Sequence, residues 1–139
     1  MPDSHDSVAA MVAAYAERAV HAAQALNTRL DYSDNSVNEL EAVLSRVSSP
    51  AEGDAMAEAC KMWGSYLGEV VRRRFGGEWS IETYPGKGFA TLTLNVGGAK
   101  LFPSMKIHRR LTRGAEDDLC VFYRMVKDRL EAAPGGKIQ

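Results

Sequence analysis

Cysteine and histidine are scarce in this chain. Its 139 residues include two cysteines, Cys60 and Cys120, and three histidines. So few cysteines, sixty positions apart, favour reduced side chains in a cytoplasmic protein over a disulfide framework. The histidines, His5, His21 and His108, have neither i, i+4 spacing nor a nearby cysteine pair. We therefore expect no metal site.

Long apolar runs are also missing. The longest uncharged apolar run covers residues 8–16, whereas about 20 residues are needed to span a bilayer. The chain opens with Met-Pro-Asp-Ser-His-Asp, which is acidic where a secretory signal carries positive charge. We expect no membrane contact and no export.

Charge is nearly balanced overall but unevenly distributed. Residues 1–60 carry three basic and ten acidic side chains, and the remainder carries 14 basic and 8 acidic ones. An acidic layer folded onto a basic one would explain this split, and so would a basic surface reserved for a partner.

Length and the ordinary 45% hydrophobic content predict one domain, residues 1–132, followed by a flexible tail, residues 133–139.

Helical periodicity dominates the first half of the chain. Apolar residues at i, i+3, i+4 and i+7 predict helices over residues 7–26, 36–47 and 50–75. The first is rich in alanine, so its thin apolar face permits close approach of another helix, within the fold or across a homodimer. The third is so apolar that we expect it to be the central, most buried element.

Start signals place the second and third helices. Ser36 and Glu39 have the spacing of a capping box, and Ser49-Pro50 with Glu52 predicts a helix that begins at Pro50. On the third helix Gly64 and Gly68 lie one turn apart and would let a neighbouring element approach closely.

The second half alternates as strands do before it returns to helix. Period-two patterns and turn residues predict three antiparallel strands in a meander, over residues 78–84, 89–96 and 99–102. A short helix follows over residues 103–112. The last helix, over residues 116–130, begins at an acidic run. Gly97-Gly98 has the composition of a two-residue hairpin loop. The predicted fold class is α+β, with a small three-stranded antiparallel meander packed against four to five helices.

No catalytic constellation is found. The run from Asp31 to Asn35 resembles a calcium loop, but Ser36 and Ala42 stand where glycine and glutamate are required. Gly86-Lys87-Gly88 lacks the remaining positions of a phosphate loop. We therefore expect no enzyme activity and no cofactor.

Two basic clusters are the candidate partner-binding residues. Arg72, Arg73 and Arg74 close the third helix, and Lys106, Arg109, Arg110 and Arg113 share one face of the short helix. They form a surface for an acidic protein partner if they are exposed. The alternative is internal pairing with acids of the first half, such as Asp31, Asp34, Glu39 and Glu41.

Three blocks of sequence resemble a known group. They are Leu30-Asp31-Tyr32-Ser33 running into Ser36-Val37, Gly64-Ser65-Tyr66-Leu67-Gly68-Glu69 followed by Gly76-Gly77-Glu78-Trp79, and Phe102-Pro103 with Arg110-Leu111, Gly114-Ala115-Glu116-Asp117-Asp118 and Phe122-Tyr123. Together they resemble a family of small bacterial cytosolic domains of unknown function. Asp118 departs from the small hydroxyl residue expected there. The resemblance implies a bacterial α+β protein and no defined activity.

These observations favour a non-enzymatic protein-binding module, of an immunity or adaptor type. A nucleic-acid-binding protein that uses the arginine clusters is the alternative, and the net charge of −1 speaks against it. Binding of an acidic protein is thus the first expectation and binding of nucleic acid the second.

Overall fold

The computed structural model describes residues 4–132, which form an α+β domain, as predicted. In chain order the elements are α1 (Ser4–Gln24), α2 (Ser36–Arg46), α3 (Asp54–Phe75), β1 (Glu78–Thr83), β2 (Ala90–Val96), β3 (Ala99–Leu101), α4 (Pro103–Arg113), the 3-10 turn η1 (Gly114–Asp117) and α5 (Leu119–Ala132). The predicted tail, residues 133–139, lies outside the described residues.

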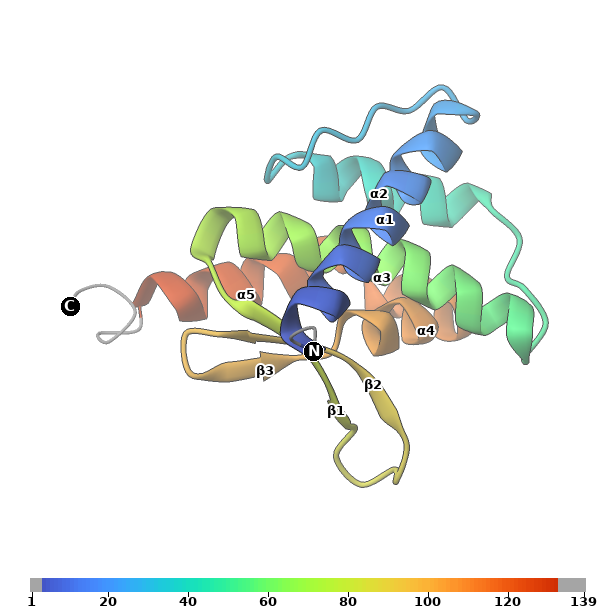
Figure 1. The fold of residues 1–139 in the computed structure, drawn as a ribbon. Helices are drawn as coiled ribbons and strands as arrows, with labels where there is room; N and C mark the ends of the chain where they lie inside the picture. The colour runs from blue at the N-terminus through green and yellow to red at the C-terminus, as the bar shows by residue number, and fades with distance from the viewer. Residues whose placement is uncertain (1–3, 133–139) are drawn as a thin grey trace.

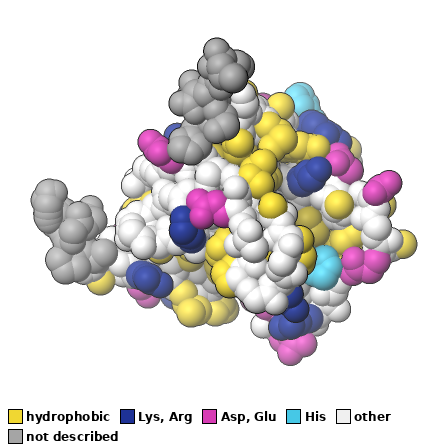
Figure 2. All heavy atoms as spheres, turned by 60° about the horizontal axis from the view of Figure 1, so that its bottom comes forward, with side chains coloured by type: hydrophobic (Ala, Val, Ile, Leu, Met, Phe, Trp, Pro, Cys, Tyr) yellow, Lys and Arg dark blue, Asp and Glu magenta, His cyan; other side chains and the backbone are white. Residues whose placement is uncertain are grey.

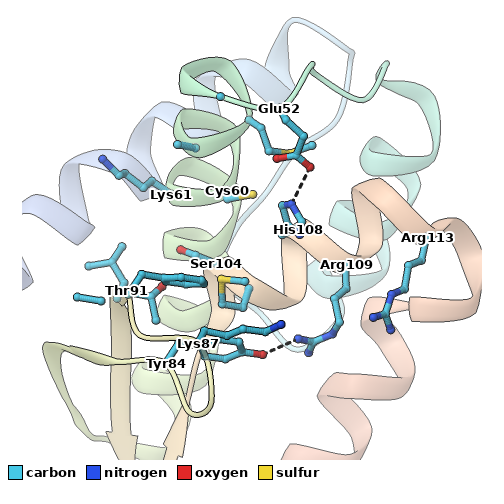
Figure 3. A pocket seen from close by; sticks show the side chains of 17 residues that line it. Glu52, Cys60, Lys61, Tyr84, Lys87, Thr91, Ser104, His108, Arg109 and Arg113 are labelled. Carbon is cyan, nitrogen blue, oxygen red and sulfur yellow. Dashed lines mark hydrogen bonds and ion pairs between the residues drawn. The ribbon is translucent and has the colours of Figure 1, made fainter.

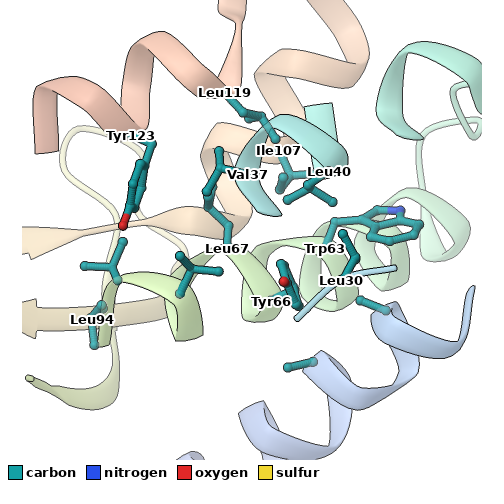
Figure 4. Close-up of a cluster of buried hydrophobic side chains, with 14 of the residues drawn as sticks. Leu30, Val37, Leu40, Trp63, Tyr66, Leu67, Leu94, Ile107, Leu119 and Tyr123 are labelled. Atoms are coloured by element: carbon teal, nitrogen blue, oxygen red, sulfur yellow. The ribbon is translucent and has the colours of Figure 1, made fainter. Parts of the chain in front are cut away.

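Helix α3 is the central element, as its apolar sequence predicts. It lies between α1 on one side and α4 on the other (Figure 1). Tyr66 and Leu67 on this helix have no exposed surface, and they belong to the core shown in Figure 4. The predicted close approaches at its glycines are confirmed. A Cβ at Gly64 would lie 2.7 Å from the Cα of Ser104, and one at Gly68 would lie 2.2 Å from the ring of Trp79.

The alanine-rich helix α1 uses its apolar face within the chain. Val12, Ala16, Ala19 and Ala23 are fully buried, and α1 crosses α3 over much of its length (Figure 1). Small side chains allow this close crossing. Of the two uses that the sequence left open for this face, the structure shows the one within the fold, and the homodimer stays a prediction.

The sheet is the predicted antiparallel meander in the order β1-β2-β3. Gly97 and Gly98 form its two-residue loop, and both have positive φ, +57° and +78°, as a type I′ turn requires. The β1–β2 hairpin extends well beyond the short β3 (Figure 1). Strand β3 pairs only with residues 94–96 of β2.

One predicted helix start and one predicted cap are wrong, although α2 begins at Ser36 as predicted. Helix α3 begins at Asp54 rather than Pro50, and Gly53, with φ of +118°, is the residue before it. No capping box forms at α2 either. The hydroxyl of Ser36 instead donates to the carbonyl of Ser33 and accepts from the hydroxyl of Tyr66. The Ser36 hydroxyl, which the local pattern assigned to a helix cap, instead takes part in a buried tertiary hydrogen bond.

The start of the last helix also differs from the prediction. The acids at 116–117 lie in η1, and α5 begins at Leu119. The carboxylate of Asp118 accepts hydrogen bonds from the backbone N–H groups of Cys120 and Val121, at 2.6 and 3.2 Å. Asp118 is therefore an N-cap, a role that aspartate fills as well as serine does.

Candidate functional site

The first basic cluster is engaged with carboxylates. Arg72 and Arg73 both bind Glu69, with closest N–O distances of 2.7 and 3.4 Å. Arg74 binds Asp34 at 2.6 Å and Glu131 at 3.0 Å. These three arginines bind carboxylates of their own chain, but their side chains are 37%, 44% and 42% exposed and Arg72 and Arg73 share a single carboxylate.

Glu69 is the buried centre of this cluster. Only 3% of the residue is exposed, and its carboxylate also accepts a hydrogen bond of 2.8 Å from the indole N–H of Trp79. Burial alone would raise the pKa of Glu69, but the hydrogen bonds from Arg72 and Trp79 outweigh it and lower that pKa below its ordinary value. The carboxylate ties α3 to β1.

The second cluster divides into a buried half and an exposed half. Arg110 and Lys106 are 6% and 7% exposed. Arg110 binds Glu41 and Lys106 binds Asp117, so neither forms part of a free surface. The alternative explanation, pairing with acids of the first half, holds for Arg110, whereas Lys106 pairs with an acid of the second half. Arg109 and Arg113 are more open, with 31% and 61% of their side chains exposed.

A single carboxylate faces three cations at the end of α4. Asp117 lies 3.1 Å from the amine of Lys106, 3.6 Å from Arg109 and 3.8 Å from Arg113. The hydrogen bond from Lys106, helped by the charges of the two arginines, holds the pKa of Asp117 below its usual range. One negative charge cannot neutralise three positive ones, so α4 keeps an excess of positive charge on this side.

That excess borders an open groove. The groove lies between the first turns of α3, the β1–β2 hairpin and α4, and has a volume of about 580 Å³ (Figure 3). Its floor is apolar and is formed by Met56, Ala57 and Cys60 of α3, Leu92 of β2 and Met105 of α4. On the face shown in Figure 2 hydrophobic side chains gather, with Lys, Arg, His and also Asp and Glu side chains around them.

The rim of the groove is strongly basic. Lys61, Lys87, Arg109 and Arg113 line it, and Glu52 is the one carboxylate among the lining residues. Four cations among the lining residues thus face one lining carboxylate, but three of them are ion-paired within the chain: Lys61 lies 3.6 Å from Glu58, and Arg109 and Arg113 share Asp117. Among residues 4–132 Lys87 has no ion-pair partner.

Hydrogen bonds fix the two ends of the groove. The Tyr84 hydroxyl accepts from Arg109 at 3.0 Å, which ties the hairpin to α4 beside Lys87 (Figure 3). At the other end, the ring of His108 lies 3.0 Å from the carboxylate of Glu52, in the segment before α3. Both contacts join parts of the chain that are far apart in sequence, so the groove is a product of the tertiary fold.

Cys60 lies in the floor of the groove and is 7% exposed. Burial raises the pKa of its thiol to about 11. A thiol with so high a pKa is almost wholly protonated at neutral pH, so Cys60 contributes apolar surface to the floor and is no nucleophile.

The sequence patterns found part of this site. They named Arg109 and Arg113 but missed Lys61 and Lys87 and the whole floor. Lys87 follows Gly86 in a predicted turn, and an unpaired cation in a turn between two strands is the signal that was available. Lys61 gave none, because a single lysine on an apolar helix is ordinary.

Comparisons with known proteins give no relative. No protein-family model matches the chain, and neither the curated proteins nor the solved structures contain a significant match.

Within residues 4–132 no three histidine, cysteine or acidic side chains are grouped as a metal ion would need. In the same range, no helix has the length and hydropathy to cross a membrane.

Proposed function

We propose that this protein is a non-enzymatic protein-binding module whose groove takes an acidic, partly apolar segment of a partner protein. The observation that supports the proposal is an apolar floor bordered by four cations, of which Lys87 has no ion-pair partner among residues 4–132 and Arg109 and Arg113 share a single carboxylate. Such a surface is complementary to aspartate and glutamate side chains flanking leucine, valine or phenylalanine.

The dimensions of the groove support this proposal. A volume of about 580 Å³ equals that of a small-molecule site, about 300–1,000 Å³, and is enough for a few side chains of a partner segment. Apolar side chains of the partner would contribute affinity by leaving water, and its carboxylates would set orientation and speed association. Arg109 and Arg113 suit carboxylates because a guanidinium can bind both oxygens at once.

The bacterial, cytoplasmic setting is proposed on the sequence resemblance, which implies no defined activity. The adaptor or immunity-type role is proposed on the groove, which such a protein would present to one partner. The proposed partner is accordingly a protein with an acidic segment, rather than a metal, a cofactor or a small substrate.

Selection of peptides tests the proposal. Random twelve-residue peptides displayed on phage are selected on the immobilised full-length protein, and the affinities of the selected sequences are measured as synthetic peptides. We expect enrichment of acidic residues beside aliphatic or aromatic ones. The double variant Lys87→Glu/Arg113→Glu should bind these peptides at least tenfold more weakly, because two attractive charges become repulsive.

A matched control separates the groove from general charge. Arg124→Glu/Arg129→Glu makes the same change of charge at two exposed arginines on α5 that do not line the groove, and it should leave the affinity unchanged. Equal losses in this variant and in the groove variant would show nonspecific charge attraction. Failure to select any peptide, or selection of peptides without acidic residues, would contradict the proposal.

A further inference from the structure

One edge of β2 is unpaired where it borders the groove. Strand β1 pairs with β2 over its whole length, from Ala90 to Asn95, but β3 on the other side reaches only to Leu94. Within residues 4–132 no strand lies beside Ala90 and Leu92 on the β3 side. No strand therefore continues the line of β3: the chain turns into α4, which contacts β2, and along this edge Ala90 is exposed whereas Leu92 is 6% exposed.

The hydrogen-bond alternation tells which backbone groups face this edge. Tyr84 donates its N–H to the carbonyl of Phe89 at 2.8 Å, so this pair is hydrogen-bonded, and the next pair, Thr83 and Ala90, is not. Residues of a non-hydrogen-bonded pair direct their N–H and C=O groups away from each other. Ala90 and, two residues further, Leu92 therefore present these groups to the unpaired edge.

The groove itself touches this edge. The consecutive residues Phe89, Ala90, Thr91 and Leu92 all line it. Side chains of a strand alternate between its two faces, so a cavity lined by four consecutive residues runs along the edge of the strand rather than across one face. In Figure 3 the hairpin borders the groove on one side, with Ser104 and His108 of α4 across from it.

We propose that the partner segment binds as an added β-strand on the unpaired edge of β2, in line with β3. This inference rests on the proposed function and specifies the conformation of the ligand. Backbone bonds to Ala90 and Leu92 supply sequence-independent affinity, as in other cases of strand addition. Alternate side chains of the segment then enter the apolar floor beside Met56 and Met105.

The basic residues lie at one end of the place proposed for the added strand. Lys87 lies in the β1–β2 turn, and Arg109 is tied to Tyr84 at the base of that turn. Lys87 and Arg109 lie side by side in Figure 3, and Arg113 follows on the same helix. A carboxylate of the added strand, from a side chain or from a C-terminus, would lie near this end of the edge.

Proline substitution tests the edge with a matched control. Ala90→Pro removes an N–H that faces the groove, and Thr83→Pro removes the N–H of its partner in the same pair, which faces the opposite edge. We expect Ala90→Pro to weaken binding of the selected peptides about tenfold or more, and Thr83→Pro to leave it unchanged. Thermal unfolding of both variants shows whether each remains folded.

Hydrogen exchange in the unaltered protein tests strand addition even if a proline variant fails to fold. A saturating concentration of a selected peptide should slow hydrogen exchange at the Leu92 N–H at least tenfold. The exchange rate at the N–H of its cross-strand partner Ile81 should not change. Peptide binding without protection of Leu92, or equal losses in both folded proline variants, would overturn strand addition and leave the groove function standing. A protein that selects no peptide would fail the proposed function itself.

Discussion

The guanidinium of Arg110 donates hydrogen bonds to both carboxylate oxygens of Glu41, at distances from 2.8 to 3.0 Å, and the two residues are 69 positions apart in the sequence. Their side chains are 7% and 14% exposed. The same carboxylate accepts the backbone N–H of Leu119 at 3.1 Å. This contact joins α2, α4 and the start of α5, and it removes Arg110 from any binding surface.

Replacement of Arg110 should therefore destabilise the fold. Arg110→Ser leaves Glu41 buried without its cation, and breaking such a pair costs about 3–5 kcal/mol. Arg113→Ser, on the same helix, should change stability by less than about 1 kcal/mol because that side chain is exposed. Urea unfolding of the two variants measures both values. Equal, small losses would mean that the buried ion pair contributes little.

The spacing of the basic residues on α4 was informative, but their exposure was not predictable from it. Lys106, Arg109, Arg110 and Arg113 do share a side of the helix. All four face carboxylates, because Glu41 on α2 and Asp117 in η1 lie against that side, but only Lys106 and Arg110 are buried there. The charge imbalance between the halves of the chain indicated pairing of the kind seen between Arg110 and Glu41 but could not name the pair.

Local patterns placed most elements and failed at particular starts. The apolar periodicity of α3 and the glycines of the β2–β3 loop predicted structure correctly, because each acts within a few residues. Ser49 and Pro50 resemble a helix start, yet the chain continues to Gly53 before α3 begins. In this position the segment brings Glu52 to His108 at the groove. That contact depends on α4, which lies 50 residues further along.

A side chain at Gly64 should disturb the packing of α3 on α4. The added Cβ of Gly64→Ala would lie 2.7 Å from the Cα and 2.8 Å from the backbone nitrogen of Ser104, so the helices must separate. Overpacking of this kind costs about 1–3 kcal/mol. Ala55→Leu, at an exposed position of the same helix, is the control and should be nearly neutral. Thermal melts compare the two, and an unchanged melting temperature for Gly64→Ala would contradict the close approach.

The buried carboxylate of Glu69 should make stability depend on pH. Its pKa is lower in the folded protein than the ordinary value of 4.5, so it contributes stability above about pH 4.5. That contribution falls as the pH drops through the lower, folded-state pKa. Glu69→Gln removes the charge but keeps an oxygen for Trp79.

We expect Glu69→Gln to cost about 1.5–3 kcal/mol at pH 7, the range for hydrogen bonds to a charged group. The difference from the unaltered protein should shrink as the pH is lowered from 5 toward 2. Urea unfolding at several pH values measures it. A difference that stays constant over this range would show that the charge of Glu69 is not the source of the stability.

Nucleic acid should bind poorly, although the chain carries 17 lysine and arginine residues. Arg72, Arg73, Arg74 and Arg110 already bind carboxylates, which a phosphate would have to displace. The remaining basic residues at the groove surround an apolar floor rather than following a line of phosphates. For a 20-nucleotide single-stranded RNA at 0.15 M salt we expect a dissociation constant weaker than about 10⁻⁴ M, the weak end of nonspecific binding. Fluorescence anisotropy over a salt series measures the affinity and its slope. Tight binding with a steep salt slope, lost in Lys87→Glu/Arg113→Glu, would instead assign the basic rim to phosphates, because each neutralised phosphate releases condensed counterions.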